Sequence, residues 1–399
     1  MLKVLHITES MTAAGGGTST AFVELIESLL AHPDEIAVLA ISQRLPPGDA
    51  ALGWIASHDQ SRWTFTGPPG RLRPGAMFGE ALAALDRFRP DVLVLHGLWC
   101  TDLIALARLA QHRRIAVVVH PHGMLVRAAL ARSHTKKAMF RFLTGSPGVF
   151  SRAGAFVFAT DGELRDSDLS MLGPSATSPA RAVIPLAVNM AVAADSRPDL
   201  RAAGRARFNL APGEPALVFM GRLHPVKRVE LTIDAFAKAS KDHPGLKLML
   251  VGDGEATYVD SLRARAQSLG VLQAVIFAGW LSGDAKWQAL AAADALIINS
   301  EFENFCYALV EALIVQTPVI MTDNLAMAPA AQNAGAGFMA TSDPDALAAA
   351  ITRLLAISTD RASMGARGRA WVEASFSRPA VGAALVRLYQ SISKEPVAP

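Results

Sequence analysis

Short apolar runs alternate with helix-like segments along most of this 399-residue chain, and this alternation limits the folds that it can adopt. Residues 91–96, DVLVLH, and residues 115–119, IAVVV, are short and almost wholly apolar, which is typical of strands buried on both faces of a sheet. Residues 101–111 between them have the apolar spacing of a helix. Repeated strand–helix–strand units form parallel sheets covered by helices. The sequence therefore predicts an α/β protein with doubly wound sheets, whose ligands bind at the carboxyl ends of the strands.

Length and composition bound the class of protein. A chain of 399 residues is long enough for two or three domains, and 51% hydrophobic with 18% charged residues is typical of a globular protein. Asp294 and Glu311 interrupt the most apolar regions, so no segment is predicted to span a bilayer. The first ten residues, MLKVLHITES, are typical of a strand and not of a signal peptide. Cys100 and Cys306 have neither metal-ligand nor disulfide-framework spacing, and we expect a reducing, cytoplasmic location.

Positive charge is concentrated in one stretch, although the formal net charge is only +3. No acidic residue lies between Asp102 and Asp161, where cations are interleaved with apolar residues. The cations are Arg108, Arg113, Arg114, Arg127, Arg132, Lys136, Lys137, Arg141 and Arg152. A basic amphipathic surface of this kind suits anionic lipid, which predicts peripheral contact with the inner face of the cytoplasmic membrane. A solvated cationic face is the alternative, and nucleic acid is not expected because no binding module accompanies the charge.

Histidines follow two of the apolar runs. One run ends at His96, and the next is followed by His120 and His122. Because the carboxyl ends of parallel strands meet at one edge of a sheet, we expect these side chains to face one cleft. A single histidine at a strand end is usually structural, whereas two in one crevice favour a functional role.

Residues 300–320, SEFENFCYALVEALIVQTPVI, combine a loop, a helix and the start of a strand. A helix that begins near Cys306 would leave the N–H groups of Cys306, Tyr307 and Ala308 free, and together with the helix dipole they suit a diphosphate. Glu303 and Glu311 would be ~12 Å apart if the segment between them were helical, which is comparable to the span of a nucleotide sugar. Two solvated glutamates on an amphipathic helix are the alternative.

A cation pair follows the apolar run 217–220. Gly221 closes that run, and Arg222 and Lys227 come next, before the helix-like residues 231–236. An arginine and a lysine five positions apart at a strand end can both reach one diphosphate. Two surface cations would be the ordinary interpretation of an isolated pair, but the glycine before it and the helix after it favour a binding site.

These motifs resemble those of retaining glycosyltransferase family 4, and the resemblance extends over nearly the whole chain. Residues 303–320 resemble the family's E-x7-E motif, and residues 221–236 its G-R-L-x-x-x-K-G-x-x-x-L-I-x-A-F signature. Residues 121–125, PHGML, resemble a subgroup that builds bacterial surface polysaccharides. The sequence departs from the pattern where Cys306, Arg228 and Gln316 replace glycines and where LAVN at 186–189 replaces N-G-V-D. A cysteine at 306 would narrow the approach to the diphosphate.

The resemblance implies the GT-B fold, with two doubly wound Rossmann-like domains that face each other across a cleft. Residues 1–190, with a returning C-terminal helix over 377–395, would form the acceptor-side domain. Residues 191–376 would bind the nucleotide sugar. Independently of the resemblance, residues 191–215 are polar and contain proline and arginine, which predicts that they form the link between the domains. The implied reaction is retaining, metal-independent transfer of a sugar from a nucleoside-diphosphate sugar to a hydroxyl of a glycan, expected to be lipid-linked, in surface polysaccharide biosynthesis. No cofactor besides the donor substrate is expected.

The resemblance also implies roles for single residues. Glu303 would contact the donor sugar, Glu311 would bind the ribose, and His122 would act beside the reaction centre. Arg222 and Lys227, with the amides of Cys306, Tyr307 and Ala308, would bind the diphosphate, and Gly16, Gly17 and His96 would line the cleft. Two alternatives stay open: a non-catalytic subunit that binds nucleotide sugar, because Cys306 and Gln316 depart from the motif, and a GT-B nucleotide-sugar epimerase.

Overall fold

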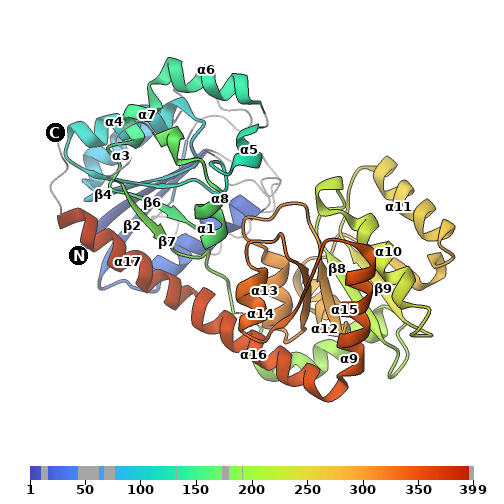
Figure 1. Cartoon of the computed structure of the whole chain (residues 1–399). Helices are drawn as coiled ribbons and strands as arrows, with labels where there is room; N and C mark the ends of the chain where they lie inside the picture. The colour runs from blue at the N-terminus through green and yellow to red at the C-terminus, as the bar shows by residue number, and fades with distance from the viewer. Residues whose placement is uncertain are drawn as a thin grey trace. The chain divides into compact units, whose positions relative to one another are not determined.

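The chain forms two compact units, each built on one parallel sheet. The computed structural model describes residues 1–9, 17–43, 63–66, 77–131, 133–172, 179–190 and 192–394. The first unit comprises Met1–Asn189 and Ser375–Pro399, and the second comprises Met190–Ala374. Figure 1 shows helices on both faces of each sheet. The prediction of two doubly wound, Rossmann-like α/β domains is confirmed.

The first unit has a seven-stranded sheet with the order β3-β2-β1-β4-β5-β6-β7. Its strands are β1 (Leu2–Thr8), β2 (Ile36–Gln43), β3 (Trp63–Thr66), β4 (Val92–His96), β5 (Ala116–His120), β6 (Ala155–Phe158) and β7 (Ala180–Val183). Its helices are α1 (Gly17–Leu30), α3 (Phe78–Phe88), α4 (Thr101–His112), α5 (Arg127–Ala131), α6 (His134–Thr144), α7 (Ser146–Phe150), α8 (Asp161–Asp166) and α17 (Arg378–Lys394), with a short 3-10 turn over Leu169–Leu172.

Successive residues of the central strands pack into two separate cores, one on each face of the sheet. Val92 and Val94 of β4 pack with α1 and α17, whereas Leu93 and Leu95 pack with α3 and α4. The alternation follows from the period of two along a strand. Burial on both faces explains why β4 is a continuous apolar run and why periodicity identifies it so clearly.

The C-terminal helix α17 packs against α1 in the first unit. The Arg378 guanidinium at its first residue contacts Glu24 at 2.8 Å and Glu27 at 3.3 Å, both on α1. All three side chains are largely buried, so the ion pairs anchor the first turn of the helix. Val381 and Leu385 of α17 then join the core that α1 shares with the sheet.

The second unit has a six-stranded sheet with the order β10-β9-β8-β11-β12-β13. Its strands are β8 (Ala216–Met220), β9 (Lys247–Val251), β10 (Val275–Gly279), β11 (Ala295–Ile298), β12 (Val319–Thr322) and β13 (Gly337–Ala340). Its helices are α9 (Arg197–Arg207), α10 (Val229–Ala239), α11 (Ala256–Ser268), α12 (Gly283–Ala292), α13 (Tyr307–Ile314), α14 (Ala328–Asn333) and α15 (Pro344–Ala356). Helix α16 (Ser358–Phe376) leads from this unit into the last segment of the chain.

Residues 191–215, predicted to form the link between the domains, instead contain helix α9, which packs against α12 in the second unit. Arg201 of α9 donates to the carbonyls of Ala291, Ala292 and Ala293, at 2.9 to 3.0 Å, and pairs with Asp294 at 2.9 Å. The arginine therefore satisfies carbonyls at the C-terminal end of α12, which have no partner within that helix. The polar composition of the segment reflects this contact and not a solvated linker.

The last strand of the first unit, β7, spans Ala180–Val183 and is not a continuous apolar run. The Ile184 N–H still bonds to the Phe158 carbonyl at 2.9 Å, and Pro185 has no N–H to continue the ladder. β7 pairs only with β6, at the edge of the sheet, so one side needs no strand partner. An edge strand tolerates a charged residue such as Arg181, so an apolar run does not mark β7 in the sequence.

Two loops at the carboxyl ends of β8 and β9 lie in direct backbone contact. A Cβ atom at Gly252, where φ is +146°, would meet the Gly221 carbonyl oxygen at 1.8 Å. A Cβ at Gly254 would meet the Leu223 carbonyl oxygen at 2.0 Å. Because these glycines let the two loops touch, the β9 loop fixes the path of the chain around Arg222.

Gly252→Ala should therefore lower the free energy of unfolding by about 3 kcal/mol or more, since it adds backbone strain to a steric clash. Gly245→Ala is the matched control, because φ there is +83° but nothing lies within 4 Å of the added Cβ. The control should lose only about 1 kcal/mol. Urea unfolding of both variants measures the difference, and equal losses would show that the two loops are not in contact.

Candidate active site

Arg222 lies in the loop after β8, between two fixed backbone positions. The Gly221 N–H donates to the Val251 carbonyl at 2.9 Å, and the Leu223 N–H donates to the Asp253 carbonyl at 2.8 Å. Arg222 is exposed, and its side chain makes no hydrogen bond or ion pair within the described part of the chain. A guanidinium on a fixed backbone with its donors unused is suited to binding an anion.

Lys227 and Glu303, which belong to the two separate sequence motifs, form an ion pair. Lys227 ends a short 3-10 turn, which His224 caps by accepting the Val226 N–H at 3.2 Å. Glu303 Oε1 accepts from both Lys227 Nζ and the Ser300 hydroxyl, the latter at 2.9 Å. The two side chains are only 22% and 16% exposed, so solvent screens the pair less than a surface ion pair. The cation motif and the first carboxylate thus form one site.

The second carboxylate, Glu311, pairs with a residue that the sequence did not reveal. Glu311 Oε1 on α13 accepts from Lys286 Nζ on α12 at 2.8 Å. Lys286 also lies over the ring of its neighbour Trp287, with the ammonium 4.4 Å from the ring centroid. Lys286 sits in no recognisable motif, and only the packing of α12 beside α13 shows this contact.

Cys306 precedes α13 and is buried. Helix α13 begins at Tyr307, as predicted, and the N–H groups of Leu309 and Val310 both bond to the Cys306 carbonyl. The amides of Tyr307 and Ala308 come before these first intrahelical bonds, as at the start of any helix. Cys306 is 6% exposed, so its thiol does not narrow the surface in front of the helix as expected from the sequence. Burial, and secondarily the charge of Glu303, raises the pKa of the Cys306 thiol to about 12.

The strand-end histidines of the first unit meet, and a further histidine joins them. His96 pairs in register with His120 across β4 and β5. His96 Nδ1 lies 3.0 Å from His122 Nε2, and His96 Nε2 lies 3.0 Å from His6 Nδ1 on β1. His6, His96 and His120 are buried, whereas His122 is half-buried. His96, predicted to line a cleft, is thus an interior residue that contacts the more accessible His122.

The glycine loop predicted to line the cleft is described only in part. Gly16 lies outside the described residues, and Gly17 is the first residue of α1. Phe22 of that helix packs edge-on against the His96 ring, with centroids 4.7 Å apart. The helix that Gly17 begins therefore contacts the histidine cluster.

A buried carboxylate holds the turn that carries His122. Glu163 of α8 is 3% exposed and accepts the N–H groups of Gly123, at 2.5 Å, and Ala159, at 2.6 Å. His122 itself has φ +49°, a left-handed conformation that is uncommon for residues other than glycine. The sequence T-D-G-E from Thr160 matches the T-x-x-E pattern of a capping box, and that signal could have identified Glu163.

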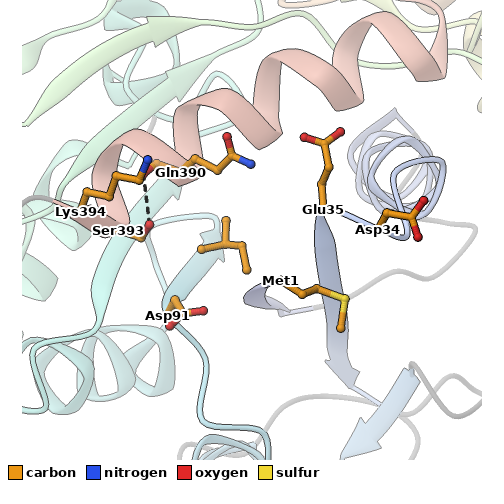
Figure 2. A pocket seen from close by; sticks show the side chains of 8 residues that line it. Met1, Asp34, Glu35, Asp91, Gln390, Ser393 and Lys394 are labelled. Carbon is orange, nitrogen blue, oxygen red and sulfur yellow. Dashed lines mark hydrogen bonds between the residues drawn. The ribbon is translucent and has the colours of Figure 1, made fainter.

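A shallow hollow lies at the end of the first sheet that is opposite the histidines (Figure 2). It is lined by Met1, Leu2, Asp34, Glu35, Asp91, Gln390, Ser393 and Lys394. Met1 and Asp91 precede β1 and β4, so the hollow lies at the amino ends of the strands. Ligands of parallel sheets bind at the carboxyl ends, where the histidines lie. The hollow is therefore not the candidate site.

Comparison with known families agrees with this geometry. Residues 15–166 match the model of Glycosyltransferase Family 4, and residues 201–371 match that of Glycosyl transferases group 1. The chain belongs to the GT-B glycosyltransferases. The two matched segments correspond to the two compact units, and the second contains both the cation and the carboxylate motifs.

Among curated relatives, the chain is similar to a D-inositol 3-phosphate glycosyltransferase of Actinosynnema mirum, with 28% identity over 77% of this chain and 76% of that protein. It is also similar to an alpha-monoglucosyldiacylglycerol synthase of Streptococcus pneumoniae, with 26% identity over 62% of this chain and 55% of that protein. The matched parts of such relatives range from 30% to 76% of their own length. Among solved structures, Anabaena HepE in complex with UDP has the same fold, with a TM-score of 0.76 and 19% identity over 98% of this chain and all of that chain.

The thiols of this glycosyltransferase should resist modification in the native state. Burial raises the pKa of Cys100 as well as that of Cys306. At a pKa of about 12, only about one Cys306 thiol in 10,000 is ionised at pH 8, and the thiolate is the reactive form. Ellman's reagent should therefore label neither cysteine at pH 8 until guanidinium unfolds the protein. Rapid release of two equivalents from the native chain would contradict the burial of these residues.

Proposed function

We propose that this glycosyltransferase transfers a sugar, with retention of anomeric configuration, from a nucleoside-diphosphate sugar to a hydroxyl of a lipid-linked glycan in surface polysaccharide biosynthesis. The observation that carries the donor assignment is the contact between Lys227 and Glu303, which joins the two motifs into one charged site. Arg222 precedes Lys227 in the same loop, and the first turn of α13 follows Glu303. Such a site has the charges that a diphosphate and its attached sugar require.

Positive charge at the diphosphate would be the main catalytic contribution. As the bond from sugar to phosphate breaks, negative charge accumulates on the departing diphosphate, and fixed donors that face this charge lower the barrier. Arg222, Lys227 and the amides of Tyr307 and Ala308 would supply these donors. Two cations and a helix N-terminus can perform this role without a metal ion.

The two glutamates would orient the donor. Glu303 and Glu311 each use only Oε1 in the contacts seen among the described residues, so Oε2 of each can accept from a sugar hydroxyl. Lys286 would hold Glu311 in place for the ribose, and Lys227 would hold Glu303 for the transferred sugar. Both carboxylates would act through hydrogen bonds, and we assign neither as a covalent nucleophile. In the implied front-face reaction, the leaving phosphate takes the proton of the acceptor hydroxyl.

His122 would contact the transferred sugar. It is half-buried at the carboxyl end of the sheet, and burial lowers its pKa to about 4. The imidazole is therefore neutral at pH 7 and would contribute a hydrogen bond and not a positive charge.

Removal of either diphosphate cation should weaken donor binding. Each of Arg222→Ala and Lys227→Ala loses a charge-assisted contact worth about 1.5–3 kcal/mol, which corresponds to about 10- to 150-fold in donor affinity. Lys227→Ala should be the more damaging, because it also leaves the Glu303 carboxylate unpaired. Lys241→Ala, which removes an equivalent charge from an exposed position of the same unit, is the control.

The measurement begins with a thermal-shift panel of UDP-, GDP- and ADP-sugars, because a ligand of the folded state raises the melting temperature. Titration of the preferred donor into the variants follows, and product anomers are assigned by NMR. Donor affinity within twofold of wild type in both cation variants would remove Arg222 and Lys227 from the site. Donor binding without hydrolysis or transfer would favour a non-catalytic subunit, and a changed sugar without transfer would favour an epimerase.

The acceptor proposal rests on α6, which presents an apolar and cationic surface. Met139, Phe142 and Leu143 are 60%, 86% and 71% exposed, and Lys136 beside them is also exposed. Lys137 instead donates to a backbone carbonyl and lies over the ring of Trp99, so it is engaged within the protein. Apolar side chains bordered by a cation suit the interface of an anionic membrane, where a lipid-linked acceptor resides. One relative is named as the synthase of a glycosylated diacylglycerol, which agrees with a lipid acceptor. No described helix is long and apolar enough to cross a membrane.

The triple variant Met139→Ser, Phe142→Ser, Leu143→Ser should therefore release the protein from anionic vesicles. Each of these side chains would bury apolar area in the membrane, so the triple change should weaken binding by about tenfold or more. Leu269→Ser, at another exposed apolar position, is the control. Flotation with phosphatidylglycerol vesicles at low and high salt measures the effect, because added salt screens Lys136. A wild-type chain that ignores anionic vesicles at low salt would exclude this surface.

A further inference from the structure

Three imidazoles of the first unit form a row that ends at the surface. His6 Nδ1 lies 3.0 Å from His96 Nε2, and His96 Nδ1 lies 3.0 Å from His122 Nε2. His6 and His96 are 0% and 3% exposed, whereas His122 is half-buried. Within the described residues, no group forms a hydrogen bond with Nδ1 of His122. The row thus leads from the interior of the sheet to one accessible nitrogen.

All three rings are neutral at physiological pH. Burial lowers the pKa of His6 to about 3 and that of His122 to about 4. Burial also lowers the pKa of His96, and the neighbouring histidines lower it further. A neutral imidazole has one N–H and one lone pair. Both nitrogens of His96 are engaged, so His96 donates a hydrogen bond through one and accepts through the other. The hydrogen bonds of the row are therefore all donated outward, from His6 towards His122, or all inward, from His122 towards His6.

The inner end of the row favours one direction. His6 Nε2 is buried and has no partner among the described residues. If the hydrogen bonds were donated inward from His122, His6 Nε2 would carry an N–H that has no acceptor. If they are donated outward, His6 Nε2 has only a lone pair that no donor uses. A buried donor without an acceptor is the rarer and costlier arrangement, so the outward direction is preferred.

We propose that His6 and His96 are positioning residues that place the proton of His122 on Nδ1, so that His122 presents an N–H donor to an oxygen of the transferred sugar. His6 Nδ1–H donates to His96 Nε2, and His96 Nδ1–H donates to His122 Nε2. His122 Nδ1 is then protonated and cannot act as a base towards the acceptor hydroxyl. This role rests on the proposed function, in which His122 contacts the sugar.

The backbone around His122 holds the ring at the end of the row. Glu163 accepts the Gly123 N–H at 2.5 Å, and the Met124 N–H bonds to the Pro121 carbonyl at 3.0 Å. These bonds close the turn on both sides of a residue whose φ is +49°. Backbone and side chain therefore both restrict the direction of the His122 donor.

The same region could be considered as a metal site, because one ring nitrogen from each of His96, His120 and His122 lies within 4.8 Å of the others. Their rings are stacked, however, with interplanar angles of 19° to 29°. Ligand lone pairs lie in the ring plane, so nearly parallel rings do not direct three of them at one ion. The hydrogen-bonded row accounts for the stacking better than a metal centre does.

The tautomer of His122 can be measured directly on the full chain. With ¹⁵N-labelled histidine, long-range ¹H–¹⁵N spectra distinguish Nδ1–H from Nε2–H, and a His122→Gln variant assigns the resonances. Wild type should show Nδ1–H at His122. His6→Leu removes the inner donor and should shift His122 towards Nε2–H, whereas His6→Asn retains a side-chain donor and should keep the wild-type tautomer. His120→Phe, which alters the stack but not the row, should also keep it.

Kinetics provide the second measurement. His6→Leu should lower kcat by about tenfold with little change in the KM for donor, and His6→Asn should recover most of the loss. An Nε2–H tautomer in wild type, or the same tautomer in wild type and His6→Leu, would overturn the proposal. Zinc that shifts all three histidine resonances and raises the melting temperature would also overturn it. The spectra need no donor substrate and no turnover. They therefore test whether His6 and His96 set the tautomer of His122 separately from the proposed transferase function.

Discussion

Parallel pairing at the middle of each sheet is the constraint on which both candidate sites depend. In the second unit β8 pairs with β9 on one side and with β11 on the other, so the loop with Arg222 and Lys227 lies between the loops that follow those strands. The contact of Lys227 with Glu303, in the loop after β11, follows from this order. In the first unit β4 lies between β1 and β5, and the register sets His96 opposite His120. In both units residues far apart in sequence become neighbours because carboxyl ends of strands share one edge.

The same constraint explains what the sequence could reveal. Apolar runs predicted the central strands, and the glycine, arginine and lysine after one run were correctly expected to follow a strand end. That Arg222 and Lys227 bind a diphosphate stays a prediction. Lys286, His6 and the arginine contacts of α9 escaped prediction for a common reason. Each depends on which helix or strand packs beside another, and no local pattern encodes that choice. The polar segment 191–215 was predicted to be a linker because of its composition. In the structure, Arg201 within it bonds to carbonyls of a helix roughly 90 residues away in sequence, and no local pattern reveals that contact.

Three departures from the family pattern have different structural meanings. Arg228 and Gln316, which replace glycines, have φ of +50° and +59°, so each retains the left-handed backbone that glycine adopts freely. The strain, about 1–2 kcal/mol for each residue, is offset in part by hydrogen bonds of Arg228 to Ser342 and of Gln316 to the Ala194 carbonyl. Cys306 has φ −91°, which any residue tolerates. The cysteine therefore alters the core beneath the first turn of α13 and not the backbone geometry.

The two units use opposite electrostatic means to prepare polar groups for a ligand. The second unit keeps charges, and it pairs Lys227 with Glu303 and Lys286 with Glu311 so that no partly buried charge is isolated. In the first unit, burial makes the imidazoles of the row neutral, so each ring has one donor and one acceptor nitrogen. This neutrality lowers the folding stability at low pH. The histidines of the unfolded chain bind protons near pH 6.5, whereas folded His6 and His122, with pKa values of about 3 and about 4, stay neutral to a lower pH. The free energy of unfolding therefore falls as the pH falls from about 6.5 to these values. A charged diphosphate and an uncharged sugar hydroxyl need different partners, and in the proposed function the ion-paired cations would bind the one and the neutral donors the other.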